Sequence, residues 1–166
     1  MSESKSNNKR LPGILVSPVV LVRLSSILVF LLMVGHTSAY PWTSTHGLQE
    51  IQLVDSMRSV EFEFMGERSS YWSLYFGWGL LISALLLTLA IILWLLSGLA
   101  RLAPRRLGVI IGIISASCLV GACLSFRFFY LPPFLLFSAI CVILLTAAVQ
   151  LLKQQTLFTD GKTEKP

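Results

Sequence analysis

Apolar residues divide the chain into four long hydrophobic runs that are separated by polar segments. The clearest run is 74–99, which contains no charged residue. As an α-helix, a segment of this length rises about 39 Å, more than the roughly 30 Å hydrocarbon core of a bilayer. Lipid accommodates such a helix because all of its backbone hydrogen bonds are internal. The run therefore predicts a membrane-spanning helix.

The other three runs predict three more spans, so the expected fold is an all-α, integral membrane four-helix bundle. The spans are expected at about 14–39, 72–99, 107–126 and 132–152. They form one transmembrane domain, 14–152, between polar termini, 1–13 and 153–166, that are expected to be disordered. Composition agrees with this fold class, because 55% of the residues are hydrophobic and only 13% are charged.

Basic residues flank the runs unevenly, and this asymmetry predicts the orientation. Four spans put both termini on one side, and that side, with the 101–106 loop, carries nine basic residues: Lys5, Lys9, Arg10, Arg101, Arg105, Arg106, Lys153, Lys162 and Lys165. The other side carries Arg58, Arg68 and Arg127. The positive-inside rule then predicts cytoplasmic termini and an outer loop at 40–70. These flanks explain the net charge of +5, so no nucleic-acid partner is predicted.

The first run has a second interpretation, a cleaved signal peptide. Basic residues precede the apolar stretch, and Thr37-Ser38-Ala39 resembles a cleavage site that would release a chain beginning at Tyr40. The whole run is about 26 residues long, which is long for the apolar region of a signal peptide. A retained helix is therefore favoured over cleavage.

The outer loop is expected to contain a short amphipathic helix at the membrane surface. Apolar residues recur every three positions, at Ile51, Val54, Met57 and Val60. This spacing is close to the helical period. The segment 60–64 alternates with period two, as a strand does, but no partner strand is evident. The pattern therefore favours a helix to about residue 60 and a turn at Met65-Gly66. Such a segment would be a surface cap or a lid over a pocket.

Polar and aromatic residues gather where the first span ends and the second begins. His36 is a functional candidate, because ionisable residues inside a membrane are energetically unfavourable. Side chains on the second span recur at spacings of three and four, so they share one helical face. The resulting candidate pocket for a ligand consists of His36, Glu67, Arg68, Tyr71, Trp72 and Tyr75. The alternatives are a structural hydrogen bond for His36 and an interfacial anchor for the others.

No pattern of residues predicts a cofactor, a metal site or a catalytic nucleophile. The two histidines, His36 and His46, lack metal-ligand spacing, and the three cysteines form no CxxC pair. Cys118 and Cys123 are five residues apart and point to different faces of a helix. Arg23, inside the first run, is expected to snorkel or to pair near the cytoplasmic side.

Small residues recur along the third run and predict a close helix–helix contact. They are Gly108, Gly112, Ser117 and Gly121. Rows of small residues let two helix backbones approach closely. The contact is either within the bundle of one chain or between two copies in a homodimer.

Two motifs flank the predicted outer loop: Gly35-His36-Thr37, and Arg68-Ser69-Ser70-Tyr71-Trp72, which runs into YFGWGL at 75–80. With these motifs, the segment 20–96 resembles a family of small, uncharacterised bacterial four-helix membrane proteins. The resemblance implies a four-helix fold in the bacterial inner (plasma) membrane, and it favours His36, Arg68 and Trp72 as site residues. It implies no activity.

The sequence thus predicts a small multi-pass membrane protein that is not an enzyme. In contact with the lipid bilayer, it is expected to bind a lipid-like small molecule or to support a membrane partner. The alternative is a membrane enzyme, an isomerase or oxidoreductase, that acts on an apolar substrate with His36 and Glu67 in proton transfer. That alternative requires the two side chains to come within hydrogen-bond reach.

Overall fold

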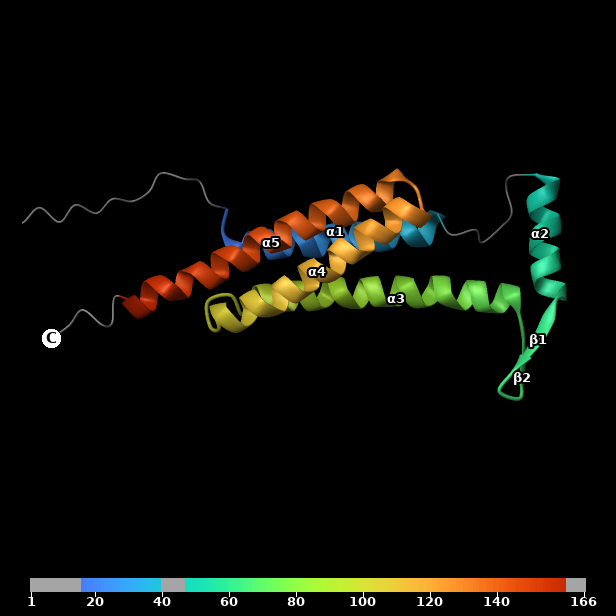
Figure 1. The fold of residues 1–166 in the computed structure, drawn as a ribbon, viewed down its shortest axis with the longest axis horizontal. Coiled ribbons are helices and arrows are strands. Elements are labelled where there is room, and N and C mark those ends of the chain that lie inside the picture. The colour runs from blue at the N-terminus through green and yellow to red at the C-terminus, as the bar shows by residue number, and fades with distance from the viewer. Residues whose placement is uncertain (1–15, 40–46, 161–166) are drawn as a thin grey trace, which may run out of the picture.

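The computed structural model describes residues 16–39 and 47–160, with side chains described as far as residue 154. Five helices and one two-stranded sheet make up this part of the chain (Figure 1). In chain order they are α1 (Pro18–Ala39), α2 (Leu48–Ser59), β1 (Glu61–Phe64), β2 (Glu67–Ser70), α3 (Tyr71–Ser97), α4 (Pro104–Phe128) and α5 (Leu131–Asp160).

Within residues 16–39 and 47–160, four helices are long and apolar enough to cross a membrane, which confirms the predicted all-α membrane bundle. They are Pro18–Ala39, Tyr71–Ser97, Pro104–Phe128 and Leu131–Gln154. The predicted disordered segment 1–13 and the first two residues of the predicted span 14–39 lie outside the described residues.

The last helix extends into the segment 153–166, which was expected to be disordered. The α5 helix continues through Asp160, past the expected end of the span at Leu152. Residues 153–160 are polar for the most part but contain no glycine or proline that would interrupt a helix, so the helix extends past the apolar part of the sequence.

The long helices pack in the spatial order α3, α1, α5, α4. The extensive contacts between them are α4 with α5, α1 with α3, and α1 with α5. The α1 helix is therefore central, and its Val22 and Val29 are almost completely buried in the core with Leu93 of α3. The α3 helix is the most exposed span, because only 17% of it is buried inside the protein, against 33% for each of the others.

Polar contacts set the register between α1 and α3, which run antiparallel. Near one end of the pair, Ser26 Oγ donates a hydrogen bond to the backbone oxygen of Ala90 at 2.7 Å. Near the other end, the hydroxyls of Thr37 and Ser83 lie 2.9 Å apart. Hydrogen bonds between spans contribute about 0.6 kcal/mol each on average, and they also fix which residues face each other.

Arg23, which was expected to snorkel or to pair, is paired with α3. Its Nε donates to Ser97 Oγ at 3.2 Å, and its guanidinium lies 5.2 Å from the centre of the Trp94 ring. A guanidinium is attracted to the face of an indole ring at this distance. The side chain is therefore held against α3 at the end of the bundle where α1 begins.

Two of the four predicted small residues serve contacts inside the bundle. A Cβ added at Gly108 would lie 3.0 Å from Leu152 of α5, and one added at Gly121 would lie 2.9 Å from the Phe137 ring of α5. Gly112 has open space around it, and Ser117 is exposed. The four residues therefore do not form one free face, and the predicted homodimer would depend on Gly112 and Ser117 alone.

The structure corrects the prediction for the second half of the outer loop. The helix ends at Ser59 and a turn forms at Met65-Gly66, as expected, but residues 61–64 are a strand. β1 pairs with β2 in an antiparallel hairpin, so its backbone groups do have a partner. The partner was not recognised because its sequence, Glu67–Ser70, contains no apolar residue. Met65 and Gly66 both have positive φ, 55° and 87°, as a two-residue hairpin turn of this twist requires.

The segment 47–70 lies at one end of the bundle. Figure 1 shows α2 standing across the end of α3, with the hairpin beside it. The start of α1, the connection between α3 and α4, and the end of α5 all lie at the opposite end. This arrangement follows from four antiparallel spans in sequence.

Candidate functional site

The predicted site residues lie at the end of the bundle that carries α2 and the hairpin, but at different levels. His36 Nε2 donates a hydrogen bond to the backbone oxygen of Gly79 at 3.2 Å. Eight residues, about 12 Å of helix, separate Gly79 from Tyr71 at the start of α3. The first turns of α3 therefore extend past the end of α1, as Figure 1 shows. His36 therefore contacts α3 at the interface between α1 and α3.

Trp72 connects α2 to the start of α3. The guanidinium of Arg58, from α2, lies 4.9 Å from the centre of the Trp72 ring. The rings of Tyr75 and Phe76 lie 5.9 Å and 6.1 Å from it on α3 itself. Trp72 is half-buried among these groups and connects α2 to the start of α3. Tyr71, the neighbouring residue, packs its ring 5.0 Å from that of Phe62 in the hairpin.

Glu67 and Arg68 point to opposite faces of the hairpin. Glu67 lies opposite Phe64 and Arg68 lies opposite Glu63 in the strand register. Side chains alternate between the two faces along a strand, and opposed residues share a face. One face therefore carries Phe62, Phe64, Glu67 and Ser69, and the other carries Glu61, Glu63, Arg68 and Ser70.

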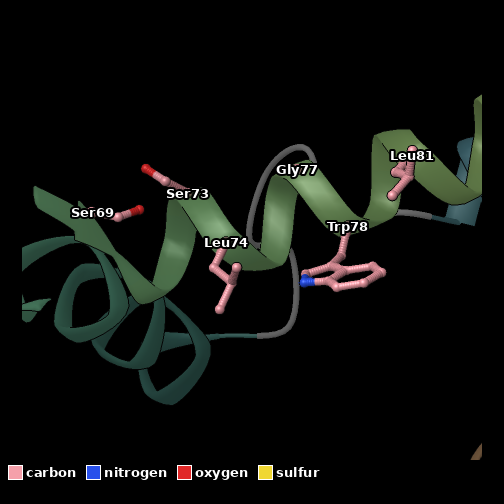
Figure 2. A pocket seen from close by; sticks show the side chains of 6 residues that line it. All are labelled: Ser69, Ser73, Leu74, Gly77, Trp78 and Leu81. Atoms are coloured by element: carbon pink, nitrogen blue, oxygen red, sulfur yellow. The ribbon is translucent and has the colours of Figure 1, made fainter. Parts of the chain in front are cut away.

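An open groove lies along α3 where it leaves the hairpin, and Figure 2 shows its lining. The groove has a volume of about 410 Å³ and is lined by Ser69, Ser73, Leu74, Gly77, Trp78 and Leu81. Gly77 forms the floor of the groove, and the space above its backbone is open, because a Cβ added there would meet nothing within 4 Å. None of the lining residues was among the predicted site residues. A sequence signal does exist, because Ser73, Gly77 and Leu81 recur every four residues beside Trp78.

The groove faces away from the rest of the bundle. Gly79 and Ser83 face α1, since they contact His36 and Thr37 there. Gly77 precedes Gly79 by two residues, about 200° around the helix, so the floor of the groove points to the opposite side of α3. His36 therefore does not line this groove. The predicted site residues lie in three places: the interface between α1 and α3, the start of α3 beside α2, and the hairpin.

The groove polarity changes along its length. Hydroxyl groups from Ser69 and Ser73 occupy the hairpin end, and Ser73 also takes part in the helix cap, where its Oγ lies 3.0 Å from Ser70 Oγ. Leu74, Trp78 and Leu81 follow toward the middle of the helix. All three are close to half exposed. Such a surface can hydrogen-bond a polar group at one end and contact a hydrocarbon chain along the rest.

Across residues 16–39 and 47–160, no three or more His, Cys, Asp and Glu side chains are grouped so that they could hold a metal ion. His46 lies outside the described residues. Comparisons with protein-family models, with curated proteins and with solved structures found no match for the chain.

Proposed function

We propose that this protein is a non-enzymatic, multi-pass membrane protein that holds an amphiphilic lipid in the groove on α3. The observation that carries the proposal is the order of groups along the groove, from two serine hydroxyls to leucine and tryptophan side chains. A membrane lipid has the same order, from a polar headgroup to an acyl chain. The groove also faces away from α1, so a lipid would enter it sideways from the bilayer without any opening of the bundle.

The depth of the groove supports this proposal. The contacts His36–Gly79 and Arg23–Ser97 mark the two ends of the α1–α3 pair. Gly79 and Ser97 are 18 residues apart, about 27 Å along the helix, which is close to the roughly 30 Å hydrocarbon thickness of a bilayer. Ser69 and Ser73 come before Gly79 in the chain and would therefore lie at the depth of the lipid headgroups. Leu81 comes after Gly79 and would lie at the depth of the hydrocarbon.

The aromatic residues around the groove fit the same depth. Tyr71, Tyr75 and Trp78 are all 43% exposed or more, and they lie within the first eight residues of α3. Tyrosine and tryptophan concentrate at the boundary between headgroups and hydrocarbon, because one end of each ring system is polar. The groove would therefore lie at the level where a lipid headgroup meets its chains.

The orientation and location of the protein are part of the proposal. The excess of Lys and Arg on the side of the termini supports a cytoplasmic position for both ends, with the groove in the outer leaflet. The family resemblance supports the inner membrane of a bacterium. A retained α1 is supported by its central position, because α3 contacts the α4–α5 pair mainly through it.

The positions of His36 and Glu67 do not favour the alternative in which the two side chains transfer protons. His36 donates to Gly79 O, about 12 Å along α3 from Tyr71, whereas Glu67 precedes Tyr71 by four residues on the hairpin. The His36 imidazole faces α3, whereas the Glu67 carboxylate lies on the same face of the hairpin as Phe64. This separation of His36 from Glu67 along the chain favours lipid binding over proton transfer between the two groups.

The proposal is tested by filling the groove. Gly77→Leu places a side chain on the groove floor, where there is room for it, and Gly112→Leu adds the same side chain at an open position on α4 as the matched control. Both proteins are purified in mild detergent and examined by native mass spectrometry. We expect the unmodified protein and Gly112→Leu to retain a lipid mass that Gly77→Leu loses. Equal lipid retention by all three would contradict the proposal.

A further inference from the structure

We infer that the groove selects a zwitterionic phospholipid whose headgroup carries an ammonium group, such as phosphatidylethanolamine, over an anionic phospholipid. This inference rests on the proposed lipid-binding function and adds the chemistry of the headgroup. It comes from the way the hairpin distributes its charges between its two faces.

Glu67 supplies the only charge on the face of the hairpin that meets the groove. Ser69 lines the groove, and Glu67 lies two residues before it on the same strand, so both side chains share one face. The residues opposite them, Phe62 and Phe64, are uncharged. A carboxylate therefore lies on the same face of the hairpin as the polar end of the groove, about 7 Å along the strand from Ser69.

The nearby cations are directed elsewhere. Arg68 is on the other face of the hairpin, opposite Glu63 in the strand register. Arg58 holds its guanidinium over the ring of Trp72 at 4.9 Å. The outer segment, residues 47–70, contains five carboxylates and only these two arginines: Glu50, Asp55, Glu61, Glu63, Glu67, Arg58 and Arg68.

The headgroup chemistry follows from these placements. An ammonium group beside the Glu67 carboxylate gains a charge-assisted hydrogen bond, and the hydroxyls of Ser69 and Ser73 can donate to the phosphate oxygens of the same lipid. An anionic headgroup, such as phosphatidylglycerol, offers its phosphate to the same hydroxyls but brings a negative charge next to the carboxylate without a compensating cation. Selectivity therefore depends on one carboxylate, whereas binding of either lipid depends on the groove.

The test compares two lipids on four full-length proteins. Phosphatidylethanolamine and phosphatidylglycerol with identical acyl chains are titrated in mild detergent, and the bound fractions are measured by native mass spectrometry. The proteins are the unmodified chain, Glu67→Gln, Arg68→Gln and Gly77→Leu. Arg68→Gln is the matched control, because it removes a charge from the adjacent residue on the opposite face of the hairpin.

We expect Glu67→Gln to lower the ratio of bound phosphatidylethanolamine to bound phosphatidylglycerol by about threefold, the scale of one exposed charge interaction. Arg68→Gln should change the ratio much less, and Gly77→Leu should reduce both lipids together. If Gly77→Leu reduces both lipids but Glu67→Gln leaves the ratio unchanged, the headgroup inference is wrong and the proposed function stands. The inference is also wrong if Arg68→Gln shifts the ratio as strongly as Glu67→Gln. If Gly77→Leu reduces neither lipid, the proposed function itself fails.

Discussion

The contact between α4 and α5 gives the most quantitative prediction about stability. At Gly121, an added Cβ would lie 2.9 Å from two atoms of the Phe137 ring. Carbon atoms in van der Waals contact lie at about 3.5–4.0 Å, so a Cβ alone overlaps the ring by more than half an ångström. Gly121→Leu adds three more carbon atoms beyond that Cβ, and the ring has to leave its place or the helices have to separate.

We expect Gly121→Leu to destabilise the protein by about 1–3 kcal/mol, the usual range for overpacking a well-filled contact. Gly112→Leu is the control, because it introduces the same side chain on the same helix where nothing lies within 4 Å. Unfolding is followed by circular dichroism as SDS is titrated into the protein in mild micelles. Light scattering on the same samples gives the oligomeric state.

The result that would refute this reasoning is a stable Gly121→Leu protein together with a destabilised Gly112→Leu protein. That outcome would mean that the row of small residues on α4 packs against another copy rather than against α5. A change from dimer to monomer in Gly112→Leu alone, with Gly121→Leu destabilised as expected, would support the homodimer and leave the α4–α5 packing intact.

Three further predictions concern other parts of the fold. Met65→Asn should stabilise the hairpin by about 1 kcal/mol, because asparagine tolerates positive φ better than methionine, and amide exchange in β1 and β2 should slow; unchanged exchange would contradict the turn geometry. Ser26→Ala should destabilise the protein by about 0.6 kcal/mol, since Ser26 bonds to Ala90 of α3, whereas Ser117→Ala, whose hydroxyl bonds within its own helix, should have little effect on SDS unfolding. The intact mass of protein purified from membranes should include α1, and a mass for a chain beginning at Tyr40 would show that cleavage occurs.

The four spans were predictable from the sequence because hydropathy alone determines them. A run of apolar residues long enough to cross the bilayer has no other stable environment, so the type and the approximate bounds of each helix followed directly. The order in which the helices pack did not follow. It depends on contacts such as Ser26 with Ala90 and Gly121 with Phe137, and the spacing of single residues does not reveal their partners.

The hairpin and the groove were missed for a related reason. Strand β2, Glu67–Ser70, has no apolar alternation, so its role as a partner for β1 becomes visible only in the backbone pairing. The groove depends on Gly77, which has no side chain, and on Ser69 and Ser73. Glycine and serine are common in helices and turns, so their presence does not by itself predict a binding site. His36 is a candidate because it is an ionisable residue in a span, and its hydrogen bond to the backbone oxygen of Gly79 becomes visible only in the structure.

The most direct test of the central claim, that the groove on α3 holds one class of lipid, is site-specific photocrosslinking in native membranes. A benzophenone amino acid is placed at Leu81, which lines the groove, and in a second protein at Leu124, an exposed residue of α4 near the same end of the bundle. After illumination, the lipids attached to each protein are identified by mass spectrometry. The account predicts that Leu81 captures mainly one headgroup class, whereas Leu124 captures the mixture present in the membrane. The same mixture at both positions would contradict it.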